Sequence, residues 1–212
     1  MKRRIIAAAL AAVLLGMGGC GGLDDPAAQT PGAALTQTDA PAETAAIPEG
    51  AITDDEGKFA FTGKTQQVGD DDHGYLQVPL GYLPFQEEGV DGLVQYSDST
   101  GTNILTLQHY ADMDYSTAAQ SMFAYMQSNE DVEGLTGATV TAGGYDALQI
   151  YGHYKDGYFL VIWFIDDPSS ESGCYYLAIE FDGEHQDLIA LSSTFQNPAD
   201  FHASGKSVDK IG

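Results

Sequence analysis

The segment YFLVIWFID, residues 158–166, is apolar at every position from Tyr158 to Ile165. Successive side chains of a β-strand point to opposite faces of the sheet. A strand of this composition therefore buries both of its faces. We expect residues 158–166 to form a central strand of a sheet that other elements cover on both sides.

Turn signals around this strand predict antiparallel connections. Residues 155–157, Lys-Asp-Gly, precede it, and an Asp-Gly pair suits the positive φ angles of a tight hairpin turn. The β-rich stretch 137–154 is therefore expected to pair with it. The polar loop 167–173 leads to CYYLAIEF, residues 174–181, which is predicted to be the next strand. Residues 92–110 have the pattern of another hairpin, with two β-rich arms around a polar turn.

Two stretches have the spacing of helices. In residues 117–128 the apolar side chains recur at helical intervals, and Ser116 is a suitable N-cap. A second helix is expected from Asp182 or Gly183, with an apolar stripe formed by Leu188, Ile189, Leu191 and Phe195. This order of elements predicts an α+β fold: an antiparallel sheet of about six strands with helices on both faces.

The N-terminus has the pattern of a secretory signal. A basic start, residues 1–4, is followed by the apolar run 5–15 and by small residues before Cys20. With Gly18 and Gly19 in front of Cys20, this stretch resembles a bacterial lipoprotein precursor and its lipobox. The resemblance implies cleavage before Cys20, a diacylglycerol on its sulfur, and palmitate among the acyl chains of the anchor. The alternative is an ordinary cleaved signal in which the cysteine has no role.

This interpretation divides the chain into four parts. Residues 1–19 are the signal peptide, and residues 20–56 are a lipid-anchored, acidic tether whose composition predicts disorder. Residues 57–197 are the globular domain, and residues 198–212 are expected to be a loosely ordered tail. The predicted location is the cell membrane, with the protein lipid-anchored and facing outside the cytoplasm.

The charge of the chain excludes several classes of partner. Eight Lys and Arg residues stand against 31 Asp and Glu residues, for a net charge of -23. Nucleic-acid binding depends on many contacts from Lys and Arg to phosphates, so it is excluded, and anionic ligands are disfavoured. Cations, cationic or neutral ligands, peptides and glycans stay open as partners. The alternative is that the acidity serves only to keep the domain soluble and monomeric.

The order of elements, together with two short motifs, resembles the PsbP-like family. Val78-Pro79-Leu80-Gly81-Tyr82 stands where that family closes an early strand, and Ser192-Ser193-Thr194-Phe195 stands where its final helix closes. Residues 142–152, AGGYDALQIYG, are similar to the middle of the family. The resemblance implies a non-catalytic binding or accessory module, here on a membrane-anchored extracytoplasmic lipoprotein. It supplies no catalytic residues and no cofactor.

Few residues suggest chemistry. Asp70, Asp71, Asp72 and His73 form the densest polar cluster, and carboxylates with a histidine can ligate a divalent cation. The alternative for this cluster is a solvated loop. No Gly-x-Ser-x-Gly motif is present, but histidines near strand ends, His109 and His153, keep open a second hypothesis, an extracytoplasmic hydrolase with a His-centred site. Cys174 is expected to be a small buried hydrophobic residue.

Overall fold

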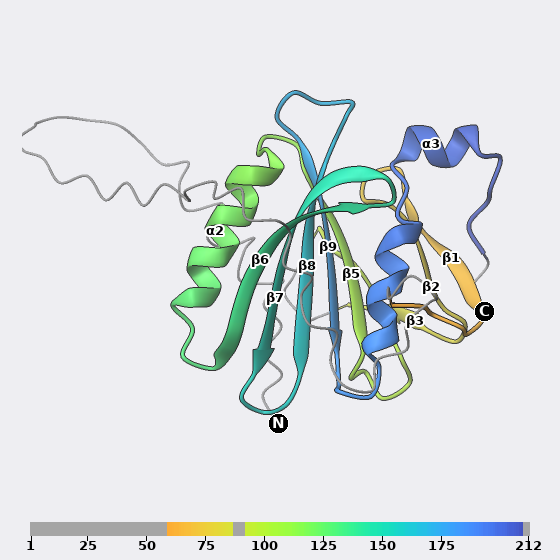
Figure 1. The fold of residues 1–212 in the computed structure, drawn as a ribbon. Coiled ribbons are helices and arrows are strands. Elements are labelled where there is room, and N and C mark those ends of the chain that lie inside the picture. The colour runs from red at the N-terminus through yellow and green to blue at the C-terminus, as the bar shows by residue number, and fades with distance from the viewer. Residues whose placement is uncertain (1–58, 87–91, 210–212) are drawn as a thin grey trace, which may run out of the picture. The chain divides into compact units, whose positions relative to one another are not determined.

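The computed structural model describes residues 59–86 and 92–209. They form an antiparallel sheet of seven strands and a separate hairpin of two strands (Figure 1). The order across the large sheet is β3-β4-β5-β9-β8-β7-β6, and the hairpin is β1-β2. The strands are β1 (Thr65–Asp70), β2 (Gly74–Pro79), β3 (Leu83–Phe85), β4 (Val94–Ser97), β5 (Ile104–Tyr110), β6 (Val132–Ala142), β7 (Tyr145–Tyr154), β8 (Phe159–Asp166) and β9 (Cys174–Phe181).

Helical elements cover both faces of the large sheet. Helix α2 (Tyr115–Gln127) contacts β6, β7 and β8. The 3-10 helix η1 (Gln186–Thr194) contacts β9 and the hairpin strand β2, and it lies in front of the sheet in Figure 1. The short helix α3 (Pro198–Ala203) follows and contacts β2.

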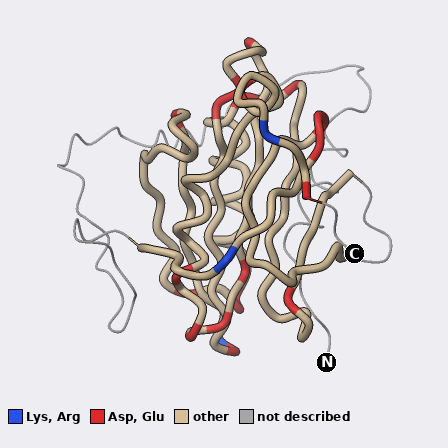
Figure 2. The backbone as a smooth tube through the Cα atoms, turned by 90° about the vertical axis from the view of Figure 1, so that its right-hand side faces the viewer, with Lys and Arg blue, Asp and Glu red and all other residues tan. Residues whose placement is uncertain are grey.

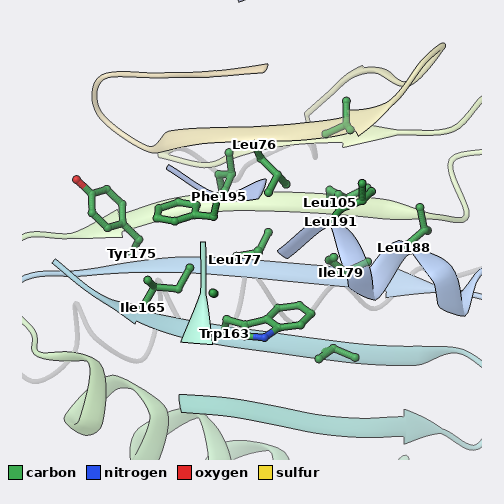
Figure 3. Close-up of a cluster of buried hydrophobic side chains, with 14 of the residues drawn as sticks. Leu76, Leu105, Trp163, Ile165, Tyr175, Leu177, Ile179, Leu188, Leu191 and Phe195 are labelled. Carbon is green, nitrogen blue, oxygen red and sulfur yellow. The ribbon is translucent and has the colours of Figure 1, made fainter. Parts of the chain in front are cut away.

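The apolar segment 158–166 contains the central strand β8, as predicted. It pairs with β7 on one side and with β9 on the other. Trp163 belongs to the core cluster that also contains Leu188 and Leu191 of η1 (Figure 3). Ile162 and Phe164 point to the opposite face, the side of α2, and both are fully buried. Both faces of β8 are therefore packed, which explains why its sequence shows no polar alternation.

The hairpins on either side of β8 also agree with the sequence. The turn between β7 and β8 contains Gly157 with a φ of 93°, and the N–H of Tyr154 donates to the carbonyl of Tyr158 at 2.7 Å. Strands β4 and β5 form the predicted second hairpin. An Asp-Gly turn imposes this geometry locally, so it could be identified without knowledge of the tertiary structure.

The polar hairpin strand β1 was not predicted, because its sequence TQQVGD has no apolar alternation. Its two glutamines are nevertheless buried. The Nε2 of Gln66 donates to the carbonyl of Tyr82 at 2.6 Å, and the Nε2 of Gln67 donates to the carbonyl of Leu76 at 3.1 Å. Hydrogen bonds to main-chain carbonyls allow these amides to be buried.

The segment after Asn197 is more ordered than the sequence predicted. Phe201 of α3 is buried and stacks on Tyr75 of β2, with 3.6 Å between ring centroids. Further along, the N–H of Gln67 donates to the Oδ2 of Asp209 at 2.6 Å. The buried Phe201 and the contacts of Asp209 thus hold this segment on the hairpin. These contacts are too scattered along the chain to stand out in the sequence.

The predicted signal peptide, residues 1–19, and the predicted tether, residues 20–56, lie outside the described residues, as does Cys20. The lipidation of Cys20 and the location at the cell membrane stay predictions, as do the domain boundaries. Within the described ranges, no helix has the length and apolar character needed to cross a membrane.

Asp114 caps helix α2, in place of the expected Ser116. Its Oδ1 accepts the N–H groups of Ser116 and Thr117 at 3.0 and 2.9 Å. Because a capping carboxylate satisfies N–H groups that have no partner inside the helix, Asp114→Ala should lower the free energy of unfolding by about 1 kcal/mol. Asp112→Ala, an exposed carboxylate two residues earlier, is the control in urea melts. An equal effect of the two substitutions would contradict the capping role.

Candidate functional site

Strand β6 forms one edge of the large sheet. Its only strand partner among the described residues is β7, and most of its residues are exposed. From Gly134 to Tyr145 the chain carries no charged residue. Long, flat and uncharged edges are unusual in proteins, because unpaired N–H and C=O groups attract a further strand.

The opposite edge of the sheet, strand β3, is protected in the usual way. It has three residues, and the middle one is Pro84. A proline has no N–H to donate, and a short strand offers few groups to pair with. The two edges of the same sheet therefore differ: β3 is blocked against pairing, and β6 is open to it.

The hairpin turn between β6 and β7 decides which backbone groups of β6 face outward. Gly143 and Gly144 have φ angles of 60° and 92°, as in a two-residue type I′ turn. The residues that flank such a turn, here Ala142 and Tyr145, exchange both backbone hydrogen bonds, and bonded pairs then alternate along the strands. The N–H and C=O groups of Gly137, Thr139 and Thr141 therefore point away from β7. We call the outer side of Thr136–Thr141 the β6 edge.

A β-bulge limits the β6 edge at its N-terminal end. The register with β7 shifts between Glu133 and Thr136, and Gly134 has a φ of 62°. A bulge of this kind bends the strand and interrupts regular pairing. The Oε2 of Glu133 lies 3.6 Å from the Nε2 of His153. The regular, uncharged part of the edge thus begins at Thr136.

Acidic residues of the described chain gather mainly at the turns, at both ends of the strands (Figure 2). The strands themselves carry few charges, as the tan tube shows. The β6 edge is therefore uncharged on a chain whose net charge is -23.

The predicted cation site, Asp70 to His73, lies in the turn between β1 and β2, where its side chains have separate partners. The Oδ1 of Asp70 accepts the N–H groups of Asp72 and His73 and contacts the Nδ1 of His73 at 2.7 Å. Asp71 instead accepts the Tyr75 hydroxyl at 2.6 Å and contacts the Nε2 of His202 at 2.7 Å. Hydrogen bonds from Tyr75 and His202 lower the pKa of Asp71.

Among the described residues, no group of three or more His, Cys, Asp or Glu side chains converges on a point that could hold a metal ion. The arrangement at Asp70–His73 is that of a self-bonded turn. Cation binding there stays a prediction, without a second feature of the structure to support it.

The histidines considered for catalysis bind carboxylates. The Nε2 of His109 lies 2.9 Å from the Oδ2 of Asp167, and the Oδ1 of the same carboxylate accepts the Ser169 hydroxyl at 2.6 Å. Asp167 therefore stands between the histidine and the serine, whereas a serine nucleophile needs the histidine in the middle. His153 faces Glu133. In the described part of the chain, no histidine is hydrogen-bonded to a serine hydroxyl.

Cys174 is buried and free. Burial, with nearby Asp114, Asp166 and Asp167, raises the pKa of its thiol to about 12, so the thiolate is scarce at neutral pH. This agrees with the expectation of a buried hydrophobic residue. Tyr176 and Tyr154 are also buried, which places these two tyrosines in the packing of the sheet.

Comparisons with known proteins find no matching family and no matching curated protein. Among solved structures, the chain is similar to the Ran-binding protein Mog1p of Saccharomyces cerevisiae, with 14% identity and a TM-score of 0.39 over 68% of this chain and 89% of that one. It is also similar to a mutant of Mog1, with 15% identity and a TM-score of 0.38 over 66% of this chain and 89% of that one. Likeness at this level assigns neither a family nor a partner to the chain.

These comparisons correct the expectations that rested on family resemblance. The structures found are of a Ran-binding protein, and neither is described as a PsbP-family protein or a lipoprotein. With no matching family, the PsbP-like assignment and the lipoprotein-module function that rested on family resemblance are withdrawn, together with the ligand, peptide or glycan partners assigned to that module. The hydrolase alternative rested on His109 and His153, and these two histidines contact Asp167 and Glu133. The motifs behind the PsbP resemblance are turn and core residues, such as the buried Phe195, which many folds require.

The β6 edge was not identified from the sequence, although residues 137–154 were expected to be β-structure. The available signal was compositional: a run of Gly, Ala, Thr and Val with neither charge nor proline. This composition indicates an open edge only if the strand lies at the edge of the sheet. A strand's position in the sheet depends on pairing between distant segments, which the composition does not reveal.

Proposed function

We propose that this protein is a protein-recognition domain that adds an extended segment of a partner protein to its sheet at the β6 edge. The observation that carries the proposal is the contrast between the two edges: β3 is short and contains Pro84, whereas β6 is long, free of proline and uncharged from Gly134 onward. Proteins that do not use an edge for pairing usually block it.

The energetics of such pairing come from the main chain. Gly137, Thr139 and Thr141 each offer one N–H and one C=O on the outer side. Each intermolecular hydrogen bond contributes about 0.5–1.5 kcal/mol net, and the alternate side chains of the added strand provide specificity. The absence of a side chain at Gly137 allows another backbone to approach closely.

A segment of another protein fits the β6 edge better than a second copy of this chain. Two copies would each bring a net charge of -23, and like charges of this size oppose close association. Glu130 and Glu133 lie exposed near the start of β6. The partner segment is therefore expected to be free of acidic residues.

Proline at position 139 tests the proposal, because it removes an outward N–H without removing a bond to β7. The probe is a displayed library of random peptides of about 12 residues, longer than a typical strand, selected against the full chain at physiological salt. Thr139→Pro should weaken binding of the selected peptides about tenfold, since it leaves one partner carbonyl without a donor.

Thr139→Val is the matched control, because it changes the side chain but keeps the N–H. It should change the affinity by less than about twofold. Both variants should melt within about 3 °C of the parent, since position 139 is exposed and its N–H is unpaired in the sheet. Equal binding to Thr139→Pro and to the parent, or the absence of selected peptides, would overturn the proposal.

A further inference from the structure

Gly137 creates a gap in the side chains that border the β6 edge. It lies on the face of the sheet that α2 covers, between Leu135 and Thr139 on the same strand face. A Cβ built at Gly137 would be 3.8 Å from Phe123 of α2 and 3.6 Å from the carbonyl oxygen of Gln149. These are ordinary contact distances, and Gly137 does not have the positive φ that would require glycine. The backbone therefore does not explain why this residue is glycine.

The side chains around the gap are apolar, and all but Ile150, the buried residue directly opposite Gly137 on β7, are partly exposed. Phe123, Leu135 and Leu148 are each half-buried, and we call these three the Phe123 shelf. Leu148 is the β7 residue directly opposite Thr139. No charged side chain lies on β6 between Glu133 and the turn. A ligand group that covers the shelf therefore has to be apolar.

We infer that the partner segment places one large apolar side chain, aromatic in size, over Gly137 and against the Phe123 shelf. This inference rests on the proposed pairing at the β6 edge. In an antiparallel pair, the residue opposite Gly137 has its side chain on the same face of the sheet as Gly137. A large side chain opposite a strand glycine covers the exposed glycine backbone, and here it also meets the ring of Phe123.

The neighbouring position 138 cannot serve in the same way. Ala138 points to the other face of the sheet, because side chains alternate along the strand. Its pair on β7 is Gln149. The structure therefore assigns the specificity of the edge to position 137 and leaves position 138 as a matched control.

The test repeats the peptide selection on two variants. Gly137→Val fills the gap with a residue that suits a strand, and Ala138→Val adds the same atoms on the other face. Peptides selected on the parent should share one aromatic or large aliphatic residue at a fixed position. They should bind Gly137→Val about tenfold more weakly and Ala138→Val within about twofold of the parent.

Phe123→Ala provides a second readout that does not alter β6. It should weaken the same peptides about tenfold and should not weaken peptides in which the large residue is replaced by alanine. Peptides that are sensitive to Thr139→Pro but indifferent to Gly137→Val and Phe123→Ala would overturn this inference and leave the proposed function standing. Peptides indifferent to Thr139→Pro would overturn both.

Discussion

Trp163→Ala and Phe164→Ala should each lower the free energy of unfolding by about 3–5 kcal/mol, although the two side chains point to opposite faces of the sheet. Trp163 is 1% exposed and Phe164 is fully buried. Trp163 packs in the cluster with Leu188 and Leu191 of η1 (Figure 3), and Phe164 contacts the ring of Tyr176 edge-on, with centroids 5.4 Å apart. Each truncation leaves a cavity in a different layer.

Urea melts followed by far-UV circular dichroism measure this effect. Tyr158→Ala is the control, because Tyr158 is 40% exposed just before β8 and should cost less than about 1 kcal/mol. A nearly neutral Phe164→Ala would show that the α2 face is not a packed layer. A nearly neutral Trp163→Ala would show the same for the η1 face.

The second large effect is expected at Asp167, which holds the loop after β8 against β5. Its carboxylate is 3% exposed and accepts the N–H and hydroxyl of Ser169 at 2.9 and 2.6 Å. It also contacts the Nε2 of His109 at 2.9 Å. Asp167→Ala leaves these groups without their acceptor, so it should lower the free energy of unfolding by about 3 kcal/mol at pH 7.

The same carboxylate should contribute to acid sensitivity. Burial alone would raise its pKa, but hydrogen bonds from Ser169 and His109 prevail and hold the pKa of Asp167 below its ordinary value of 3.8. A carboxyl whose pKa is lower in the folded state stabilises fully above the unfolded pKa, near pH 4, and loses this contribution as pH falls through the folded pKa. The parent should therefore lose stability below about pH 4 more steeply than Asp167→Asn does.

Urea melts between pH 7 and pH 3 check this expectation. Asp146→Asn is the matched control, because Asp146 is an exposed carboxylate on β7, and its acid profile should follow that of the parent. A profile of Asp167→Asn with the same steepness as the parent would contradict the proposed role of Asp167.

The parts of the fold that local chemistry dictates could be predicted from the sequence. The apolar run at 158–166 required a strand packed on both faces, and the Asp-Gly turn before it required a hairpin. The spacing of Ala118, Ala119, Met122, Phe123 and Met126 identified α2, where all of them are buried except the half-buried Phe123. In each case a few consecutive residues contain the whole signal.

The order of the strands and the residues of the candidate site became known only from the folded structure. Strand β5 pairs with β9, about 70 residues further along the chain, and that pairing leaves β6 and β3 as the two edges. His109 meets Asp167 for the same reason, 58 residues apart. Hydrophobic patterns specify which face of a strand is buried, but not which strand lies beside it. The openness of the β6 edge follows from that order, so the residues that carry the proposed function became visible only in the folded chain.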